Sequence, residues 1–396
     1  MASAGDARPL RVLQIGGLAG PGAAAGGVWA VAGMQSRALA AAGADVELAG
    51  GWLGAVPERA GAASPERVRY FRVRRPFPGA RLRGLVSLAL PRYAAARSRT
   101  ADVVHVHLCR DFITTAATLL LRRTGVPVVA QSHGMLAPSS AVPVRVFDRL
   151  ITRRLVRIPA LWLTLTEQEE DQLRGLGVRR SRMRRVVNAV PEPGLEWADP
   201  EQQVFLFAAR LAARKQPVVF AEAALEALDA GLDARFVLAG PDQGEEAAVR
   251  ALIAGSGHAD RFELVGELAP HEVQAAMARC TAFVLPSRNE PYPMTVIEAA
   301  AVGAPLIVST ECGLASELGN AGAAVLCEPT AGALAEAMRK LGADAQARSA
   351  LGAAARQVHR RVWSAEGLAR DLLGQYRLLA ASREGRAANQ GRSRAE

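Results

Sequence analysis

The chain has 396 residues, of which 50% are hydrophobic and 22% charged, a composition that excludes a disordered or fibrous protein and favours about two folded domains. Its formal net charge is +10, and only Lys215 and Lys340 among the 48 basic residues are lysines. This charge fits a solvated surface or a surface for anionic lipid, phosphate or nucleic acid, so charge alone assigns no partner.

The cysteines and the apolar runs indicate the cellular compartment in which the protein is expected. The four cysteines lie far apart without C-x-x-C spacing, which argues against a disulfide framework and a zinc motif. The N-terminus lacks the apolar core of a signal peptide, and no run of about 18 apolar residues occurs. We therefore expect a cytoplasmic protein that does not span a membrane, with peripheral contact at the inner face left open.

In the first half of the chain, apolar runs rich in β-branched residues alternate with alanine-rich segments of helical spacing, such as residues 28–43. This alternation is typical of a parallel sheet covered by helices. The predicted strands end in polar residues or glycine and occupy residues 10–17, 44–50, 102–108, 126–134 and 161–166.

A connector rich in proline and acidic residues, at 186–202, is followed by the same alternation. We predict two doubly wound, Rossmann-like α/β domains over residues 1–195 and 196–360, with a hinge near residue 195. The polar end of the chain, residues 383–396, is predicted to be a disordered tail. The strands of the second domain are predicted at residues 203–210, 234–240, 261–267, 280–287, 303–309 and 323–328.

The ends of these strands are the first places to look for a binding site, because open parallel sheets bind ligands beyond the carboxyl ends of their strands. Both predicted domains have charged residues or glycine there. The candidates are Gly26, Gly27, His133, Arg210, Gly240, Glu267 and Glu290.

The stretch RNEPYPMTVIE at 288–298 places Glu290 in a loop and Glu298 one turn inside the helix that follows. The free N–H groups of Met294 and Thr295 at the start of that helix favour an anion. Carboxylates bind sugar hydroxyls well and phosphates poorly. The stretch therefore predicts a ligand with a diphosphate in the middle and polyols at both ends, such as a nucleotide sugar.

The segment FAARLAARKQP supplies the positive charge that a diphosphate needs. Arg210 follows a strand and Lys215 lies near the start of the next helix, so a planar guanidinium and a compact ammonium can reach the same phosphates. Protein cations then replace a bound metal, and the sequence has no aspartate-rich D-x-D motif. We expect no metal and no cofactor.

Two other patterns mimic binding motifs. His105 and His107 point to one face of a strand like a metal pair, but no third ligand is near in sequence, which favours a structural or acceptor-side role. Residues 20–25, GPGAAA, satisfy G-x-G-x-x-A, but they start five residues after Ile15 and contain Pro21, so we do not interpret them as a dinucleotide site.

Taken in order, ARLAARKQP, FVLAGPDQGEE and the stretch from FELVGE to PLIVS resemble the retaining, GT-B fold glycosyltransferases of family 4, as does the N-terminal segment from Gly26. The most specific part is the E-x7-E motif with the upstream Arg210 and Lys215. The resemblance covers residues 10–380 and implies two domains facing each other across a cleft, the first on the acceptor side and the second on the donor side. It also implies a helix at 361–382 that crosses back to the first domain.

The resemblance implies a role for each site residue. Arg210 and Lys215 would bind the donor diphosphate, Glu298 the ribose hydroxyls and Glu290 the transferred sugar, with Glu290 positioning the donor and not attacking it. His133 would face the reaction centre. Gly26 and Gly27 would form a turn that approaches the donor phosphate. Gly240, Glu267, Met294 and Thr295 complete the predicted donor site.

The sequence departs from the family pattern at three positions. Pro293 stands where a glycine is usual, Gln216 and Pro217 follow Lys215 in place of glycine, and Gly313 lacks the glycine neighbour that is common there. These departures concern backbone turns near the site, and none of them changes a charged residue.

The expected partners are a nucleotide-sugar donor and a small-molecule, glycan or lipid-linked acceptor, with no nucleic acid, in a monomer or homodimer. The arginine-rich run at 67–84 could contact an anionic membrane or surround an acceptor pocket. Two alternatives to a transferase remain: a GT-B-like sugar-nucleotide epimerase or phosphorylase, and a non-catalytic module that binds nucleotide sugars.

Overall fold

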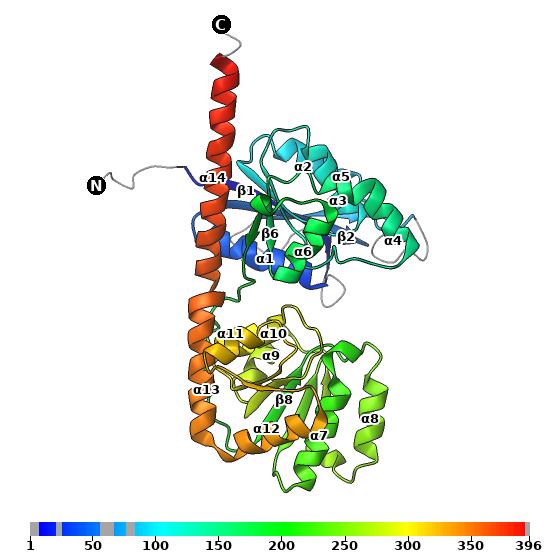
Figure 1. Ribbon diagram of the computed structural model, residues 1–396, viewed down its shortest axis with the longest axis vertical. Helices are drawn as coiled ribbons and strands as arrows, with labels where there is room; N and C mark the ends of the chain where they lie inside the picture. Colours follow the sequence, from blue (N-terminus) through cyan, green and yellow to red (C-terminus); the bar gives the residue numbers. More distant parts are fainter. Residues whose placement is uncertain (1–7, 21–25, 56–66, 77–83, 393–396) are drawn as a thin grey trace, which may run out of the picture. The chain divides into compact units, whose positions relative to one another are not determined.

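A computed structural model describes residues 8–20, 26–55, 67–76 and 84–392 (Figure 1). The chain divides into two compact units. Unit 1 runs from Met1 to Asn188 and also includes Ala365–Glu396, whereas unit 2 is Ala189–Ser364. In the part of the chain that is described, none of the helices combines the length and the apolarity needed to cross a bilayer.

Unit 1 contains a parallel sheet with strand order β3-β2-β1-β4-β5-β6-β7. The order reverses between β1 and β4, so the sheet is doubly wound as predicted. Its strands are β1 (Arg11–Ala19), β2 (Asp45–Leu53), β3 (Arg67–Val73), β4 (Val103–His107), β5 (Val128–Gln131), β6 (Leu161–Thr164) and β7 (Met183–Arg185).

The helices of unit 1 cover two chemically different faces of this sheet (Figure 1). Leu13, Ile15 and Val104 point into an apolar core beneath α2 and α3, whereas the alternate residues Gln14 and His105 lie under α1 and α14. The helices are α1 (Gly26–Ala41), α2 (Ala89–Arg97), α3 (Phe112–Leu121), α4 (Val142–Phe147), α5 (Arg153–Leu155), α6 (Glu167–Leu176) and α14 (Ala365–Arg392), and the π-helical turn η3 (Asp148–Thr152) joins α4 to α5.

Strands β3 and β7 are the two edges of the sheet and were not among the predicted strands. Both are rich in arginine, and most of their side chains are exposed or half-buried. An edge strand buries too little surface to need an apolar run, and charged residues protect such an edge from further pairing. These arginine-rich runs therefore form strands that the search for apolar runs does not predict.

The predicted disordered tail is wrong for residues 383–392, because α14 continues as a helix to Arg392. Alanine and arginine favour helices, and the segment has no proline. Residues 393–396 lie outside the described part. Near its middle, α14 packs on the sheet of unit 1 through Tyr376. At its start, Ala365 and Ala369 pack against Ala38 of α1.

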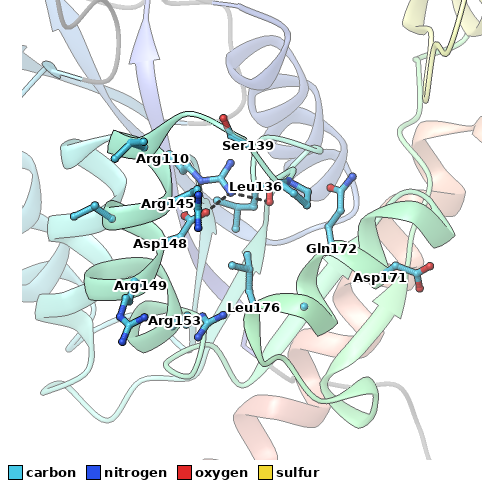
Figure 2. Close-up of a pocket in the computed structure, with 14 residues that line it drawn as sticks. Arg110, Leu136, Ser139, Arg145, Asp148, Arg149, Arg153, Asp171, Gln172 and Leu176 are labelled. Atoms are coloured by element: carbon cyan, nitrogen blue, oxygen red, sulfur yellow. Dashed lines mark hydrogen bonds and ion pairs between the residues drawn. The ribbon is translucent and has the colours of Figure 1, made fainter.

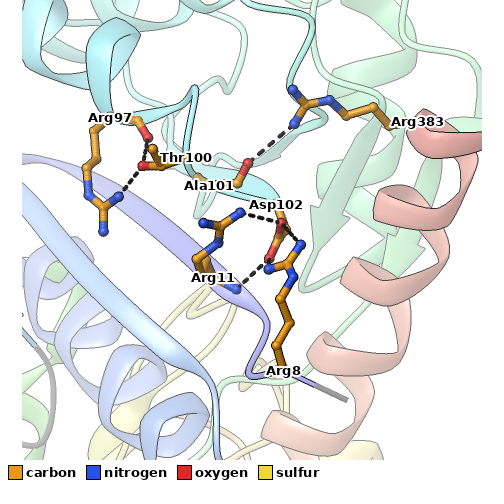
Figure 3. A network of polar contacts seen from close by, with 7 residues as sticks. All are labelled: Arg8, Arg11, Arg97, Thr100, Ala101, Asp102 and Arg383. Carbon is orange, nitrogen blue, oxygen red and sulfur yellow. Dashed lines mark hydrogen bonds and ion pairs between the residues drawn. The ribbon is translucent and has the colours of Figure 1, made fainter. Parts of the chain in front are cut away.

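A network of polar contacts ties the edge of unit 1 together at Asp102 (Figure 3). The Asp102 carboxylate accepts two hydrogen bonds of 2.8 Å from the Arg8 guanidinium and one of 2.9 Å from the backbone N–H of Arg11. Burial acts to raise the pKa of Asp102, but the hydrogen bonds from Arg8 and Arg11 outweigh it and lower that pKa to about 2. Arg383 of α14 donates to the adjacent Ala101 carbonyl at 3.3 Å.

Unit 2 repeats the doubly wound pattern with strand order β10-β9-β8-β11-β12-β13, in which all pairs are parallel. The order reverses between β8 and β11, so these two strands flank the switch point where such sheets bind ligands. The strands are β8 (Val204–Ala208), β9 (Arg235–Ala239), β10 (Phe262–Gly266), β11 (Ala282–Leu285), β12 (Leu306–Ser309) and β13 (Val325–Cys327).

Helices of unit 2 pack in two groups: α7 contacts α8 and α12, and α10 contacts α9 and α13. Helix α10 is almost wholly buried after its first turn, because it is rich in alanine and valine. The helices are α7 (Pro217–Asp229), α8 (Glu246–Ala254), α9 (Pro270–Met277), α10 (Met294–Val302), α11 (Ala315–Asn320), α12 (Ala331–Ala343) and α13 (Ala345–Val358).

The units meet at Asn188 and Ala189, not near residue 195, and unit 2 ends at Ser364. The connector belongs to unit 2 because its backbone bonds there: the Val190 N–H donates to the Trp363 carbonyl at 3.1 Å, and the Trp197 N–H donates to the Val302 carbonyl at 2.8 Å. The predicted connector is therefore a packed part of the second unit.

Candidate functional site

The switch point of unit 2 carries a buried ion pair. Lys215 follows β8 and Glu290 follows β11, and the Lys215 Nζ lies 2.6 Å from a carboxylate oxygen of Glu290. Lys215 is 9% exposed and Glu290 5% exposed, so both charges are largely withdrawn from water. The pKa of the Lys215 ammonium is lowered, first by burial, while Glu290 acts in the opposite direction.

Unusual backbone conformations shape the loops that bring this pair together. Gln216 adopts a left-handed conformation with φ 57°, at the position after Lys215 where the family pattern has glycine. Asn289, next to Glu290, has φ 48°. Residues other than glycine rarely adopt such angles, and they persist only where surrounding contacts hold them.

A close backbone approach fixes the Glu290 loop from the other side. The Gly313 N–H donates to the Glu290 carbonyl at 2.7 Å, and a Cβ at Gly313 would lie 2.1 Å from the Pro291 carbonyl oxygen. The Asn289 N–H donates to the Glu311 carboxylate at 3.1 Å. The single glycine at 313 is therefore enough for this close backbone approach, without the second glycine that is common in the family.

Two arginines surround the ion pair. Arg214 is half-exposed and its guanidinium lies 3.5 Å from Glu290, whereas Arg210 is exposed and has no side-chain partner among the described residues. Both lie close enough to Lys215 for their charges to lower its pKa. The cluster therefore has more positive than negative charge and can attract an anion.

Helix α10 begins beside this cluster, with Pro293 at its N-cap and no side-chain cap. Pro293 therefore stands just before the first helical turn and not within it. Met294 and Thr295, both half-buried, begin the helix, so their N–H groups lie in the first turn, where no intrahelical partner exists. This arrangement favours an anion at the helix start.

Glu298 lies one turn inside α10 and is half-buried. Its carboxylate has no hydrogen-bond or ion-pair partner among the residues described. Burial raises its pKa to about 7. A half-buried acid without a partner among the described residues can accept hydroxyl hydrogen bonds from a ligand, which would favour its ionised form.

The other two predicted residues of unit 2 are Gly240 and Glu267. Gly240 has φ 143°, and a Cβ there would lie 2.0 Å from the Ala209 carbonyl oxygen, so its glycine serves close backbone packing below Arg210. Glu267 follows the edge strand β10, is exposed, and makes no hydrogen bond or ion pair with the cluster in the described residues. Their contacts with a donor remain predictions.

In unit 1, three histidines lie together near the carboxyl ends of β4 and β5. His107 Nδ1 lies 2.8 Å from His133 Nε2, and the two rings stack with centroids 5.1 Å apart. His105 shares this face, as predicted, and its Nδ1 is 2.8 Å from the Tyr376 hydroxyl of α14. His105 and His107 are therefore held by hydrogen bonds to Tyr376 and His133, which is compatible with the structural or acceptor-side role expected for them.

Burial favours the neutral form of all three histidines. Burial lowers the pKa of His105 and of His133 to about 3, and that of His107 well below its ordinary value. Gln14 Oε1, 3.4 Å from His107 Nε2, can only accept a hydrogen bond, so His107 donates from Nε2 and accepts at Nδ1 from His133 Nε2. The free Nδ1 of His133 is then a hydrogen-bond acceptor, which no described residue occupies.

Glu169, which the sequence did not single out, holds the loop of His133. Its buried carboxylate accepts hydrogen bonds from the Ser132 hydroxyl, from the Gly134 N–H at 2.9 Å and from the Leu165 N–H at 2.7 Å. His133 itself has φ 50°, an uncommon conformation for a side-chain-bearing residue. Glu169 therefore stabilises the strained turn that sets the direction of the His133 ring.

Gly26 and Gly27 start helix α1, so they belong to a first helical turn and not to a separate turn as predicted. At Gly27 an added Cβ would meet nothing within 4 Å. Packing within the fold therefore does not require glycine at position 27, and the approach of Gly26 and Gly27 to the donor phosphate remains a prediction. Residues 21–25 of the GPGAAA motif lie outside the described residues.

No three His, Cys, Asp or Glu side chains in the described ranges form a group suited to a metal ion. His105 and His107, whose spacing resembles a metal-binding pair, instead form hydrogen bonds: His105 with Tyr376, and His107 with Gln14 and His133.

Comparison with known proteins agrees with this architecture. Residues 196–358 match the family model "Glycosyl transferases group 1", and residues 26–189 match "Glycosyl transferase 4-like domain". The sequence is 27% identical over 211 residues to alpha-D-kanosaminyltransferase of Streptomyces kanamyceticus, a match that covers 48% of this chain and 54% of that protein. The aligned part thus spans about half of that relative.

Solved structures match over nearly the whole chain. Sucrose-phosphate synthase from Thermosynechococcus elongatus has a TM-score of 0.70 and 20% identity, with 93% of this chain and 100% of that chain covered. Anabaena Alr3699/HepE, solved in complex with UDP and glucose, has a TM-score of 0.69 and 16% identity, with 92% and 99% covered. With both family models and the two parallel α/β units, these matches establish that the chain belongs to the group 1 glycosyltransferases of family 4 and has the GT-B fold.

Proposed function

We propose that this glycosyltransferase moves a sugar from a nucleotide-diphosphate sugar to a hydroxyl or amine of a small-molecule, glycan or lipid-linked acceptor. The observation that carries the proposal is the Lys215–Glu290 ion pair of 2.6 Å at the switch point of unit 2, beside the exposed Arg210. An anion that meets this cluster gains a fixed ammonium, a free guanidinium and the uncapped start of α10.

The donor would lie along the cluster in a defined direction. Its diphosphate would contact Arg210, Lys215 and the N–H groups of Met294 and Thr295, and Glu298 would accept the ribose hydroxyls. Ribose binding would favour the ionised form of Glu298 and so lower its pKa from about 7. The similarity to a structure solved with UDP and glucose supports this class of ligand.

We propose transfer with retention and without a bound metal. As the bond to the sugar breaks, negative charge grows on the leaving diphosphate, and fixed cations stabilise it. The departing phosphate would take the proton of the acceptor while the acceptor oxygen or nitrogen attacks from the same face. Glu290 would then orient Lys215 and the transferred sugar, with no covalent intermediate on the protein.

We also propose peripheral contact with a membrane, a binding property separate from sugar transfer. The assembly as a monomer or homodimer remains a prediction, as does the cytoplasmic location.

A thermal-shift screen in the presence of a metal chelator tests the donor class, with UDP-, GDP-, ADP- and dTDP-sugars as probes. We expect one nucleotide series to stabilise the protein, and Lys215→Ala to abolish that shift. Incubation with and without an acceptor then separates the functions. A glycosylated product of unchanged anomeric configuration supports the proposal, whereas release of free nucleotide with an epimerised sugar, phosphate-dependent turnover, or donor binding without turnover each identifies an alternative.

A further inference from the structure

A cavity of about 600 Å³ lies in unit 1 beside the segment α4–η3–α5, residues 142–155, which we call the basic helix (Figure 2). Its other walls come from α6 and from the loop after His133. The cavity lies outside the polar networks described above. Its lining combines arginines with apolar side chains, among them Leu136, Val142, Val146 and Leu176.

The floor of this cavity is already neutral. The Arg110 guanidinium donates two hydrogen bonds to the Asp148 carboxylate, at 2.8 and 2.9 Å. Arg110 also donates to the carbonyls of Leu136 and Ala137. Asp171, the other acid of the lining, pairs with Arg174. Neither acid is therefore available to compensate further positive charge.

Three further arginines line the cavity from the basic helix at intervals of four residues: Arg145, Arg149 and Arg153. All three are exposed, and none has a side-chain hydrogen bond or ion pair with any described residue. Figure 2 shows them projecting from the one helical segment. By contrast, Arg67 and Arg69 of the arginine-rich run at 67–84 already pair with Asp45 and Glu47.

Apolar side chains on the same helix are also exposed at intervals of four. Val142 is 66% exposed, Val146 50% and Leu150 54%. Met135, on the loop beside the cavity, is 52% exposed. Single exposed apolar residues are ordinary, but a row of them beside a row of unpaired arginines is the pattern of a helix that lies in a lipid headgroup region.

We propose that the basic helix binds an anionic bilayer, with Arg145, Arg149 and Arg153 on lipid phosphates and with Val142, Val146 and Leu150 at the boundary with the acyl chains. This inference names the surface for the proposed membrane contact and is independent of sugar transfer. A free phosphate would use only the arginines and leave the apolar row in water. Charge complementarity and the apolar row together therefore favour a lipid source.

Co-sedimentation of the full chain with vesicles tests the proposal, using phosphatidylglycerol against phosphatidylcholine. We expect binding to phosphatidylglycerol that weakens with salt. The variant Arg145→Gln/Arg149→Gln/Arg153→Gln should bind about a hundredfold more weakly, given the usual contribution of each arginine near an anionic surface. The matched control is Arg179→Gln/Arg180→Gln/Arg184→Gln, which should bind nearly as well as the parent chain. It removes the same charge from exposed arginines of unit 1 whose side chains have no partner among the described residues.

A second variant, Val142→Ser/Val146→Ser/Leu150→Ser, keeps the charge and should also lose binding, because a bilayer contact needs the apolar row. Retained binding in this variant, or an equal loss in the control, would overturn the inference. If inorganic phosphate displaces the chain from vesicles as strongly as competing vesicles do, the site binds a soluble anion. This result would also overturn the inference. Vesicle binding that neither helix variant weakens would overturn the inference and would place the membrane contact on another surface. Absence of vesicle binding by the parent chain would refute the membrane contact itself.

Discussion

The two units use the ends of their sheets in opposite ways. At the switch point of unit 2, Lys215, Arg210 and Glu290 keep formal charges close together. At the strand ends of unit 1, burial keeps His105, His107 and His133 neutral. One site can neutralise a charged ligand, and the other can only orient one through hydrogen bonds. Under the proposed function, unit 2 would bind the phosphates and unit 1 would position a hydroxyl group.

The largest expected effects come from the charges of unit 2. Replacing Lys215 or Arg210 by alanine should weaken donor binding and lower turnover, with kcat reduced about 10²- to 10³-fold, because each removes a cation from the leaving diphosphate. Glu290→Gln should lower turnover while donor binding is largely kept. Donor titrations and initial rates measure both effects. Equal loss of donor affinity in all three variants would contradict the assigned roles.

The variant Glu169→Gln tests the histidine site of unit 1. It replaces the carboxylate that accepts three hydrogen bonds around the His133 loop. We expect a loss of roughly 2–3 kcal/mol in the free energy of unfolding, and lower turnover with unchanged donor affinity. Denaturant unfolding and donor titration provide the two readouts. Glu167→Gln, at an exposed position of the same helix, is the control and should leave both unchanged. A loss of donor affinity in Glu169→Gln would break the division of roles between the units.

The pH dependence of stability sharpens the comparison at Glu298. A carboxyl whose pKa is raised to about 7 on folding favours the folded state below its ordinary pKa, and this advantage is lost as pH rises through 7. Glu298→Gln should therefore be more stable than the parent chain at about pH 8, by at most roughly 3 kcal/mol, and equal to it at about pH 4. Thermal unfolding across this range measures the difference. A stability difference that does not change with pH would contradict burial as the cause.

The smallest effect is expected at Gln216, whose φ of 57° places a side chain in the left-handed region. Gln216→Gly should relieve about 1 kcal/mol of strain, less the entropy that glycine adds to the unfolded chain. Gln216→Ala, which keeps a Cβ, is the control without relief. Chemical denaturation of the two variants compares them, and a glycine variant less stable than the alanine variant would exclude strain at this turn.

The sequence predicted the parts of the fold that buried strands specify. The eleven predicted strands occur within a few residues of their expected ends. The inner strands were predictable because buried parallel strands need continuous apolar runs, and the half-exposed edge strands β10 and β13 of unit 2 also have short apolar runs. Strands β3 and β7 were missed because exposed edges carry arginines. The tail was called disordered from its polarity, although alanine and arginine support the end of α14.

The site was predictable where charge and spacing carry the information. Lys215 and Glu290 were expected near one binding cleft, and their ion pair shows that they converge. Glu169 was missed because it lies in the acidic run EQEED, which resembles the solvated first turn of a helix. Only the three-dimensional path of the His133 loop turns that one carboxylate inward, and no local pattern records such a path.

The central claim is that the charges of unit 2 bind a nucleoside diphosphate. Isothermal titration of UDP, GDP, ADP and dTDP into the parent chain and Lys215→Ala, with a metal chelator present, tests it most directly. The account predicts that one of these nucleotides binds the parent chain and that the variant binds it at least tenfold more weakly. Absence of binding by all four nucleotides, or equal binding by both proteins, would contradict it.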